Sequence, residues 1–389
     1  MTAPKGKTAD LRFHDGKFRI MQVADTQDTQ VTSKDTLRFL AAALDHARPD
    51  LVVFTGDQFK GYGVSFLAGD RERNFEKAIG NLIAPFEERG VPFTFVFGNH
   101  DDQAFGISKE KQLKLYQAHK NCLAVAGDET LEGLCNQYLN IRSSDGERIV
   151  FNLYLIDSLS TTLDGRCASV TKGQIEWYRT VREHLREQAG DYVPSIVFQH
   201  IPVPEMWDVL KEVPKSHKPH AQGFRDHAGK FYDIDERFLV KGNCDFLLET
   251  PAAPAENSGE FEAFSEKGDT LAMFFGHDHN NSFVARHGSM LLSYTQGCGF
   301  NVYGPRLNRG VRIIDLSEET PKTFKTHTLL YRDLFTVKDI HNKPKYLLYS
   351  YAPPSVESVM PTLKKLGVAA AAAAVGGVLY AIAKKGGRS

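Results

Sequence analysis

One local pattern occurs five times along this chain of 389 residues: a short run of apolar, strand-type residues ends in polar side chains that can hold a metal ion. The clearest copy is Phe95-Val96-Phe97, which leads through Gly98 into an amide, an imidazole and two carboxylates. A buried strand that ends in this way places such groups at the edge of a sheet. Five strand ends from distant parts of the chain therefore predict one metal-binding rim. The candidate residues are Asp25, Gln27, Asp57, Asn99, His100, Asp101, His200, His277 and His279.

The segments between these strand ends alternate in character. Strands are expected at 18–24, 51–55 and 91–97, and helices follow Ser33 and cover 74–89. Strand and helix in alternation favour a layered α/β sheet with right-handed crossovers. Later in the chain, we expect helices at 109–119 and 171–187, strands at 149–156 and 195–199, and a late antiparallel sheet from 283–286, 290–294, 311–316 and 324–331.

The composition excludes few functions but favours a globular protein whose cysteines are reduced. Apolar residues make up 42% and charged residues 24%, and the net charge is −1, so no nucleic-acid-binding surface is evident. The five cysteines form no CxxC pair, which indicates thiols in a cytosolic setting. Cys298 lies near the predicted rim and is expected to be a packed thiol. The polar segment 214–230 has the length of a functional lid, although its three histidines are more simply expected to be solvated.

Oxygen and imidazole donors of this kind suit a pair of divalent cations, which can clamp a phosphoryl group and activate water between them. Asp57 suits a carboxylate that bridges the two ions. Asp25 can hold the first ion together with one histidine of the late cluster, while Asn99, His200 and the other late histidine hold the second. His277 and His279 are two residues apart on an extended turn, so they can face different ions.

His100 is left over from this division of donors. An imidazole beside the cluster can steady phosphate oxygens or protonate a leaving alkoxide. Either role would make His100 part of the chemistry rather than of the ion binding.

The five blocks also stand in the order of a known family pattern. The chain resembles the calcineurin-like metallophosphoesterase family, and most closely its purple acid phosphatase-like, or phosphatase Dcr2-like, branch. The resemblance implies an α/β fold, a four-layer α/β/β/α sandwich, in which a dinuclear centre at the strand ends hydrolyses a phosphate ester by attack of metal-bound water. The matching blocks are Asp25-Thr26-Gln27, Gly56-Asp57, Gly98-Asn99-His100-Asp101, His200 and Gly276-His277-Asp278-His279.

The resemblance also implies roles for single residues. His100 would be the acid, and Asp101 would orient a histidine from behind. The implied cofactors are two divalent metal ions, Mn²⁺, Fe²⁺/Fe³⁺ or Zn²⁺, and the implied partner is a phosphate-ester substrate. One ion would be held by Asp25, Asp57 and His279, and the other by Asp57, Asn99, His200 and His277.

Gln27 departs from the family pattern, which usually has histidine at this place. Its amide oxygen is a weaker donor than imidazole and would favour Mn²⁺ or Mg²⁺ over Zn²⁺. Gln27 can also contact a metal through water, or not at all. A second copy, Asp28-Thr29-Gln30, allows a shift of three residues, but Asp25 lies closer to the end of the strand.

This departure supports an alternative function: a catalytically degenerate member of the fold that binds metal or phosphate and is tethered to a membrane. A third interpretation makes the globular part the cargo of an anchor that recruits partners. The presence of His100 favours the enzyme, because a binding module has no evident need of an acid for a leaving group.

The last part of the chain differs from the rest. We expect a leader at 1–14, the phosphoesterase domain at 15–335, a linker at 336–363 and a hydrophobic tail at 364–389. Residues 366–383 carry no charge and would form a helix of roughly 27 Å, at the low end for a bilayer crossing. We therefore expect a membrane anchor, the alternative being an alanine-rich surface helix or a disordered tail. Because the first residues do not read as a secretory signal, a cytoplasmic catalytic domain is expected, either membrane-anchored or soluble.

Overall fold

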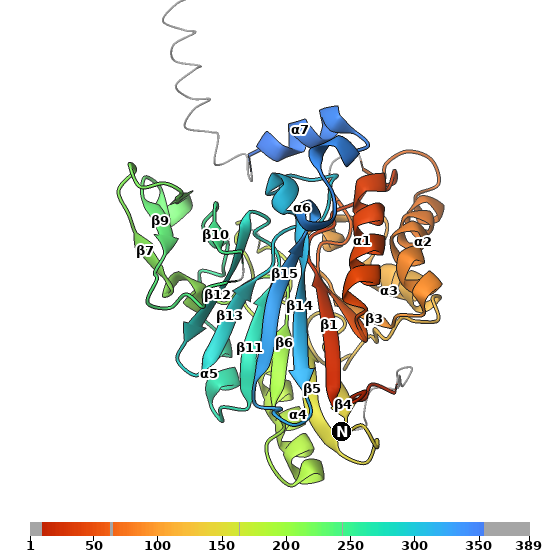
Figure 1. Cartoon of the computed structure of the whole chain (residues 1–389), viewed down its shortest axis with the longest axis vertical. Coiled ribbons are helices and arrows are strands. Elements are labelled where there is room, and N and C mark those ends of the chain that lie inside the picture. Colours follow the sequence, from red (N-terminus) through yellow and green to blue (C-terminus); the bar gives the residue numbers. More distant parts are fainter. Residues whose placement is uncertain (1–9, 63–64, 163, 243, 354–389) are drawn as a thin grey trace, which may run out of the picture.

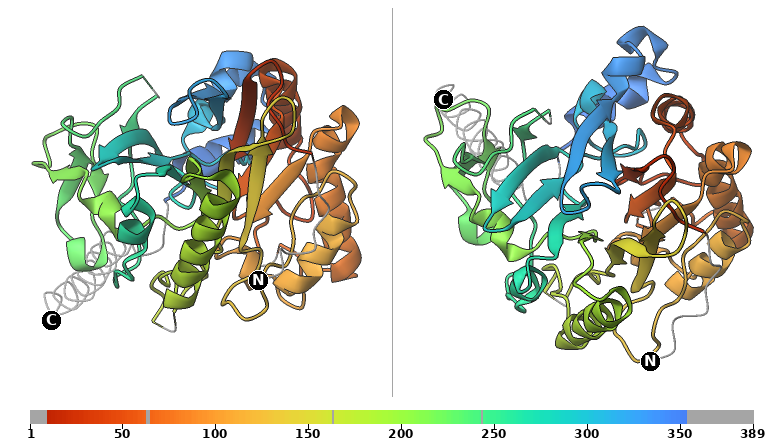
Figure 2. Two further views of the ribbon diagram at one scale, coloured as in Figure 1. Left: turned by 90° about the horizontal axis from the view of Figure 1, so that it is seen from below. Right: turned by 60° about the horizontal axis from the view of Figure 1, so that its bottom comes forward.

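Two β-sheets lie face to face and helices cover both outer sides, as Figures 1 and 2 show in the computed structural model, which describes residues 10–62, 65–162, 164–242 and 244–353. The expected four-layer sandwich is thus confirmed. The five-stranded sheet has the order β15 (Phe324–Leu330), β14 (Gly310–Ser317), β1 (Lys17–Val23), β2 (Leu51–Thr55) and β3 (Phe93–Val96). The seven-stranded sheet has the order β10 (Phe246–Leu247), β12 (Asn281–His287), β13 (Met290–Tyr294), β11 (Thr270–Phe275), β6 (Ser195–Phe198), β5 (Ile149–Leu155) and β4 (Gln137–Arg142).

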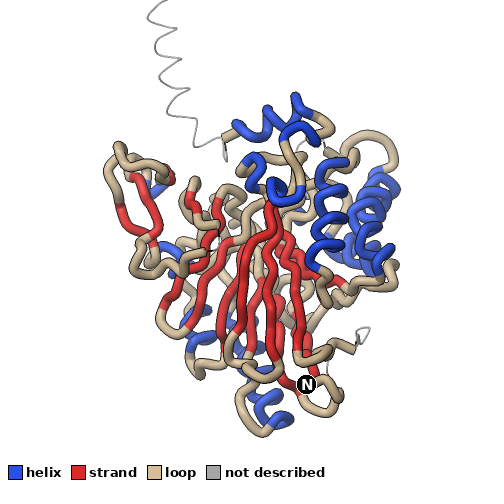
Figure 3. The backbone as a smooth tube through the Cα atoms, in the orientation of Figure 1, coloured by secondary structure: helices blue, strands red, loops and turns tan. Residues whose placement is uncertain are grey.

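The apolar side chains of the strands pack into separate layers of the hydrophobic core. In β2, Leu51 and Val53 face the other sheet, whereas Val52 and Phe54 face the helices. This follows from the period of two in a strand that is buried on both sides. In Figure 3 the strands accordingly form a central block with helices at its flanks.

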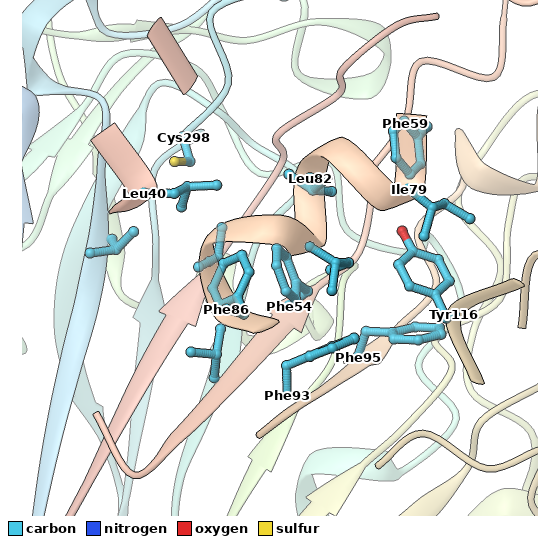
Figure 4. Close-up of a cluster of buried hydrophobic side chains, with 14 of the residues drawn as sticks. Leu40, Phe54, Phe59, Ile79, Leu82, Phe86, Phe93, Phe95, Tyr116 and Cys298 are labelled. Carbon is cyan, nitrogen blue, oxygen red and sulfur yellow. The ribbon is translucent and has the colours of Figure 1, made fainter. Parts of the chain in front are cut away.

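Helices α1 (Lys34–Ala47), α2 (Arg71–Arg89) and α3 (Lys109–Gln117) cover the five-stranded sheet, and α4 (Lys172–Ala189) and α5 (Glu260–Ser265) cover the other. Ser33 caps α1 by accepting the backbone N–H of Thr36, as its position predicts. Figure 4 shows Phe86 of α2 beside Phe54 of β2, with ring centroids 5.4 Å apart. Cys298 is buried in the same cluster, so the prediction of a packed thiol is confirmed.

Parallel pairing aligns the strand ends that carry the candidate residues. β1, β2 and β3 are parallel to one another, and so are β5, β6 and β11. The carboxyl ends of parallel strands meet at one edge of a sheet, which brings the five polar blocks toward one another.

The prediction of one late antiparallel sheet is wrong. β12 and β13 pair with each other, but β13 also runs parallel to β11 in the seven-stranded sheet. β14 and β15 join the five-stranded sheet through β1. Hairpin pairing can be read from neighbouring apolar runs, whereas the choice of sheet depends on contacts about 300 residues apart in the chain.

The histidine-bearing segment 214–230 connects β7 (Leu210–Glu212) to β9 (Phe231–Ile234) and contributes β8 (Ala221–Gln222) to the small separate sheet that these three strands form. His217 lies 2.6 Å from a carboxylate oxygen of Asp233, and the ring of His227 stacks on Trp207 with centroids 3.8 Å apart. The contacts described for these two histidines are therefore made within or beside this small sheet.

The segment expected as a linker begins with packed structure. After the short helix α6 (Tyr331–Leu334), helix α7 (Lys343–Tyr351) buries Tyr346 against the core that α1 and α2 share. The interpretation of 336–363 as a plain linker therefore fails for α7. Within the described ranges, no helix is both long and apolar enough to cross a membrane. The predicted tail at 364–389 and residues 1–9 of the predicted leader lie outside the described residues.

Candidate metal centre

Asp57, which follows β2, is the meeting point of the predicted residues. One carboxylate oxygen, Oδ2, lies 2.7 Å from Nε2 of Gln27 and 3.4 Å from Nε2 of His200. The other, Oδ1, accepts the backbone N–H of His100 at 2.9 Å. Blocks that follow β1, β2, β3 and β6 thus converge on one buried carboxylate.

Asp25 joins the same cluster from the end of β1. Its Oδ2 accepts the backbone N–H of His277 at 3.0 Å, and its Oδ1 lies 3.3 Å from Nε2 of His279. We assign the proton of His279 to Nδ1, which faces the carbonyl oxygen of Tyr303 at 2.9 Å and so turns Nε2 toward Asp25. Ligand atoms of Asp25, Asp57 and His279 all lie within 4.8 Å of one another.

His200 forms the second side of the cluster. Its Nδ1 faces the carbonyl oxygen of Thr55 at 2.8 Å, which directs Nε2 inward. Nε2 lies 3.1 Å from Oδ1 of Asn99 and 3.1 Å from Nδ1 of His277. The structure therefore brings all seven predicted ligands together.

The charges of the cluster are mutually dependent. Burial alone would raise the pKa of Asp57, but the nearby imidazoles of His200 and His100 bring that pKa well below its ordinary value. Burial opposes a charged imidazole at His200, yet the carboxylates of Asp57 and Asp25 raise its pKa to about 10. Burial and the charge of His200 lower the pKa of His277. The two carboxylates thus attract positive charge into this space.

A divalent cation fits these surroundings. Oδ1 of Asp25 is buried and has no hydrogen-bond partner among the described residues, which is costly unless a cation or a proton satisfies it. Hard carboxylate and amide oxygens together with imidazoles are a donor set for Mn²⁺, Fe²⁺ or Zn²⁺. The donors that would hold such ions are Asp25, Asp57, Asn99, His200, His277 and His279.

Two glycines of the motifs are needed because the backbone approaches the ligands closely. A Cβ atom at Gly98 would collide with the carboxylate of Asp57, and one at Gly276 would come within 2.6 Å of Oδ2 of Asp25. Asp57 and His277 themselves have positive φ angles, 52° and 72°. Strained backbone of this kind is often found at functional sites.

Residues 18–281 match the family model of the calcineurin-like phosphoesterases. The chain belongs to this family. It is 27% identical over 390 residues to probable inactive purple acid phosphatase 14 of Arabidopsis thaliana, covering 86% of this chain and 88% of the relative. It is 29% identical over 223 residues to phosphatase DCR2 of Saccharomyces cerevisiae, covering 50% and 36%. A dimetal phosphatase from Danio rerio has a similar fold, with a TM-score of 0.48 and 14% identity over 81% of this chain and 99% of that one.

Asp28, in the second Asp-Thr-Gln copy, has a structural role of its own. Its buried carboxylate accepts the backbone N–H groups of Thr29 and Ser33 and the side chain of Asn301, so Asp28 holds the turn before α1. Asp25, three residues earlier, lies in the cluster. The preference for Asp25 over the second Asp-Thr-Gln copy therefore agrees with the structure.

Gln27 turns its amide nitrogen toward Asp57 and its oxygen toward the hydroxyl of Tyr62, at 3.3 Å. The assignment of nitrogen and oxygen follows from these two partners. In this orientation Gln27 offers the cluster a donor rather than a lone pair. Its role as a metal ligand stays a prediction.

The expected role of Asp101 is wrong. Its carboxylate does not hold a histidine but accepts the backbone N–H groups of Phe59 and Gly98. Asp101 thereby joins the Gly-Asp loop to the Gly-Asn-His loop of the phosphoesterase. Burial, helped by the charge of Asp57, raises its pKa to about 7.

The sequence did not identify four residues that contact the motif residues of the cluster. Tyr62 lies against His100 with ring centroids 4.4 Å apart, and Tyr303 stacks on His279 at 4.2 Å. Glu249 accepts the hydroxyl of Tyr303, and Sγ of Cys167 lies 3.6 Å from Nε2 of His277. None of these four follows a strand in a recognisable phosphoesterase block, so the pattern gave no signal for them.

Proposed function

We propose that the protein is a metal-dependent phosphoesterase, a hydrolase that acts on phosphoric ester bonds. Family membership supports this proposal, and one observation carries it: Asp57 is approached by blocks from both sheets, in a cluster where the buried Oδ1 of Asp25 has no hydrogen-bond partner among the described residues. The natural class of substrate for such a centre is a phosphate monoester or diester.

When bound, two divalent cations would supply charge neutralisation of the phosphoryl oxygens and activation of a water molecule. Asp57 would help to hold both ions, since its Oδ2 faces donors that follow strands of both sheets, Gln27 and His200. Asp25 with His279 would hold one side, and Asn99 with His200 and His277 the other. Thr55 and Tyr303 fix two of these imidazoles through their carbonyl oxygens, so little reorientation is needed on binding.

His100 has the position of the proton donor. Its Nδ1 faces Oε1 of Gln103 at 2.9 Å, so Nε2 is the atom that faces the cluster, 3.9 Å from Asp57. The side chain is 29% exposed, unlike the buried imidazoles of His200 and His279, so a substrate can reach it. At this place Nε2–H would donate to the leaving oxygen as the ester bond breaks.

A second candidate function is binding without turnover. The Arabidopsis relative is named probable inactive, and the oxygen of Gln27 faces Tyr62 rather than the cluster. In that case metal or phosphate would bind, but no substrate would be consumed.

Hydrolysis of p-nitrophenyl phosphate and of its bis-ester with added Mn²⁺ tests the proposal. Activity should be lost on chelation and in Asp57→Asn, which keeps the side-chain shape but removes the charge. Asp45→Asn is the matched control, because Asp45 pairs with Arg89 on the surface. If neither ester is hydrolysed with Mn²⁺, Fe²⁺ or Zn²⁺ although metal analysis finds the ions bound, the enzyme hypothesis is wrong and the second candidate holds.

We also propose that residues 366–383 anchor the protein to a membrane, with the catalytic domain in the cytoplasm. The support is the uncharged sequence with basic residues on both sides. Fractionation of the full chain against a chain that ends at Pro361 tests it. Should both remain in the soluble fraction, the anchor does not exist.

A further inference from the structure

Lys60 lies between two aromatic rings near the candidate centre. Its Nζ is 4.9 Å from the ring centroid of Tyr62 and 5.3 Å from that of Tyr349, which belongs to α7. Its backbone N–H donates to the carbonyl oxygen of Asp28, so this segment is fixed beside the first phosphoesterase block. The ammonium group is thus held in place by contacts rather than extended into solvent.

Lys345 brings a second positive charge to the same place. It lies four residues before Tyr349 on α7, and residues at this spacing share one face of a helix. Burial lowers the pKa of both lysines, and the charge of Lys345 lowers that of Lys60 further. Because the ring of Tyr349 lies against Lys60, the face of α7 that carries both Tyr349 and Lys345 places the two half-buried cations in one neighbourhood.

Neither cation is neutralised within the described part of the chain, where no carboxylate oxygen lies within 4.0 Å of either ammonium nitrogen. Asp28 is the acidic group that acts on Lys345 from a greater distance, but its oxygens already accept hydrogen bonds from Thr29, Ser33 and Asn301. Two partly desolvated ammonium groups without a close counter-charge form a receptor for an anion.

Tyr62 connects this pair to the reaction centre. Its ring centroid lies 4.4 Å from that of His100 and 4.9 Å from Nζ of Lys60. In the proposed function His100 protonates the leaving alcohol, so the part of the alcohol next to His100 would lie beside Tyr62 and toward Lys60. Figure 1 shows α7 beyond the end of β1 that lies away from the N-terminus. Asp25 follows β1, which ends at Val23.

We propose that Lys60 and Lys345, with the rings of Tyr62 and Tyr349, form a second anion subsite that selects small phosphate monoesters whose alcohol carries another phosphate group. This inference rests on the proposed phosphoesterase function and specifies its substrate class. Hydrolysis forms a bond between phosphorus and the oxygen of water and breaks the bond from phosphorus to the alcohol oxygen. His100 gives that oxygen a proton, one proton of the attacking water restores His100, the other leaves with inorganic phosphate, and the second phosphate remains on the alcohol.

A matched pair of substrates tests the subsite: 1,4-phenylene bisphosphate and 4-hydroxyphenyl phosphate, assayed with Mn²⁺. After the factor of two for two equivalent esters, kcat/KM should favour the bisphosphate by about tenfold. In the double variant Lys60→Gln, Lys345→Gln this ratio should fall to about one. Lys343→Gln, which removes an exposed charge from the same helix, is the control and should keep the ratio of the wild type.

The outcomes separate this inference from the proposed function. A wild-type ratio near one, or equal ratios in the wild type and the double variant, overturns the subsite while turnover of both esters still supports the enzyme. If no ester is turned over, calorimetric titration of the Mn²⁺-loaded protein with the same two compounds replaces the kinetics. Tighter binding of the bisphosphate that is lost in the double variant then supports the subsite, and equal binding overturns it.

Discussion

Nε2 of Gln27 donates a hydrogen bond to Oδ2 of Asp57 over 2.7 Å, at the place where the family pattern has histidine. Replacing this amide by imidazole, Gln27→His, adds a softer nitrogen donor beside Asp57 and Asp25. We expect the affinity for Zn²⁺ to rise at least tenfold, with a smaller change for Mn²⁺. Competition titration against a coloured chelator measures both.

Gln30→His is the control for that substitution. It places the same imidazole on the second Asp-Thr-Gln copy, whose Asp28 holds a turn instead of facing the cluster. A Zn²⁺ affinity of Gln27→His equal to that of the wild type would show that this position does not face a metal.

Asp25 and Asp28 should respond differently to Mn²⁺. An ion bound only by the folded state stabilises it by about 4 kcal/mol at a thousand times its dissociation constant, which raises the melting temperature by several degrees. Asp25→Asn should abolish this rise. Asp28→Asn should lower the melting temperature with and without Mn²⁺, because it weakens a turn, and should keep the rise. Thermal unfolding by circular dichroism in Mn²⁺ or chelator distinguishes the two, and a full Mn²⁺ response in Asp25→Asn would exclude Asp25 from the centre.

The decrease in kcat on removal of His100 should depend on the leaving group of the ester. His100→Ala removes a proton donor that a poor leaving group needs more than a good one, so kcat should fall about 100-fold or more for phenyl phosphate and clearly less for p-nitrophenyl phosphate. Metal content should not change. Gln103→Leu, which removes only the partner of Nδ1, should give a smaller loss of the same kind. Equal losses on both esters would point to substrate binding in place of proton transfer.

Glu260 should make the stability of the fold depend on pH. Burial raises its pKa from about 4.5 to about 8, so between these values the folded state keeps a proton that the unfolded chain releases. The free energy of unfolding should therefore decrease as the pH rises through this window. Glu260→Gln should remove that decrease and be more stable than the wild type at pH 8.5, by an amount of the order of a few kcal/mol.

Denaturant titrations at pH 5 and pH 8.5 measure this difference. Glu262→Gln on the same helix is the control, since Glu262 is exposed and should leave the pH profile unchanged. A parallel shift of Glu260→Gln at both pH values would mean that packing, not the proton, is responsible.

The sequence was sufficient for those parts of the molecule in which one short segment carries both the strand and the ligand. The apolar residues Val52 and Phe54 predict β2, and Asp57 follows its end. The strand, the edge of the sheet and the candidate ligand were therefore predicted together. Parallel pairing then required the blocks to meet. The helix predicted to end at Arg89, because Gly90 follows, ends there in the structure, and Gly90 has a φ of 65°.

The parts that failed depend on contacts between distant segments. β14 pairs with β1 across most of the chain, and nothing local distinguishes this from pairing with β13. Asp101 was assigned to a histidine by its place in the motif, yet its oxygens reach Phe59 and Gly98, whose distance cannot be read from spacing. The surroundings of Lys60 likewise could not be predicted, because they depend on α7, which places Tyr349 beside it.

The two sheets divide the donors between them: Asp25, Asp57 and Asn99 follow strands of one, and His200, His277 and His279 follow strands of the other. A fragment containing either half would hold an incomplete set of the candidate ligands, however well it folded. Under the proposed metal binding, a mutation that loosens the face-to-face docking of the sheets should weaken ion retention even where the helices and strands persist. Ion content is therefore a sensitive gauge of how tightly the halves of this molecule are joined.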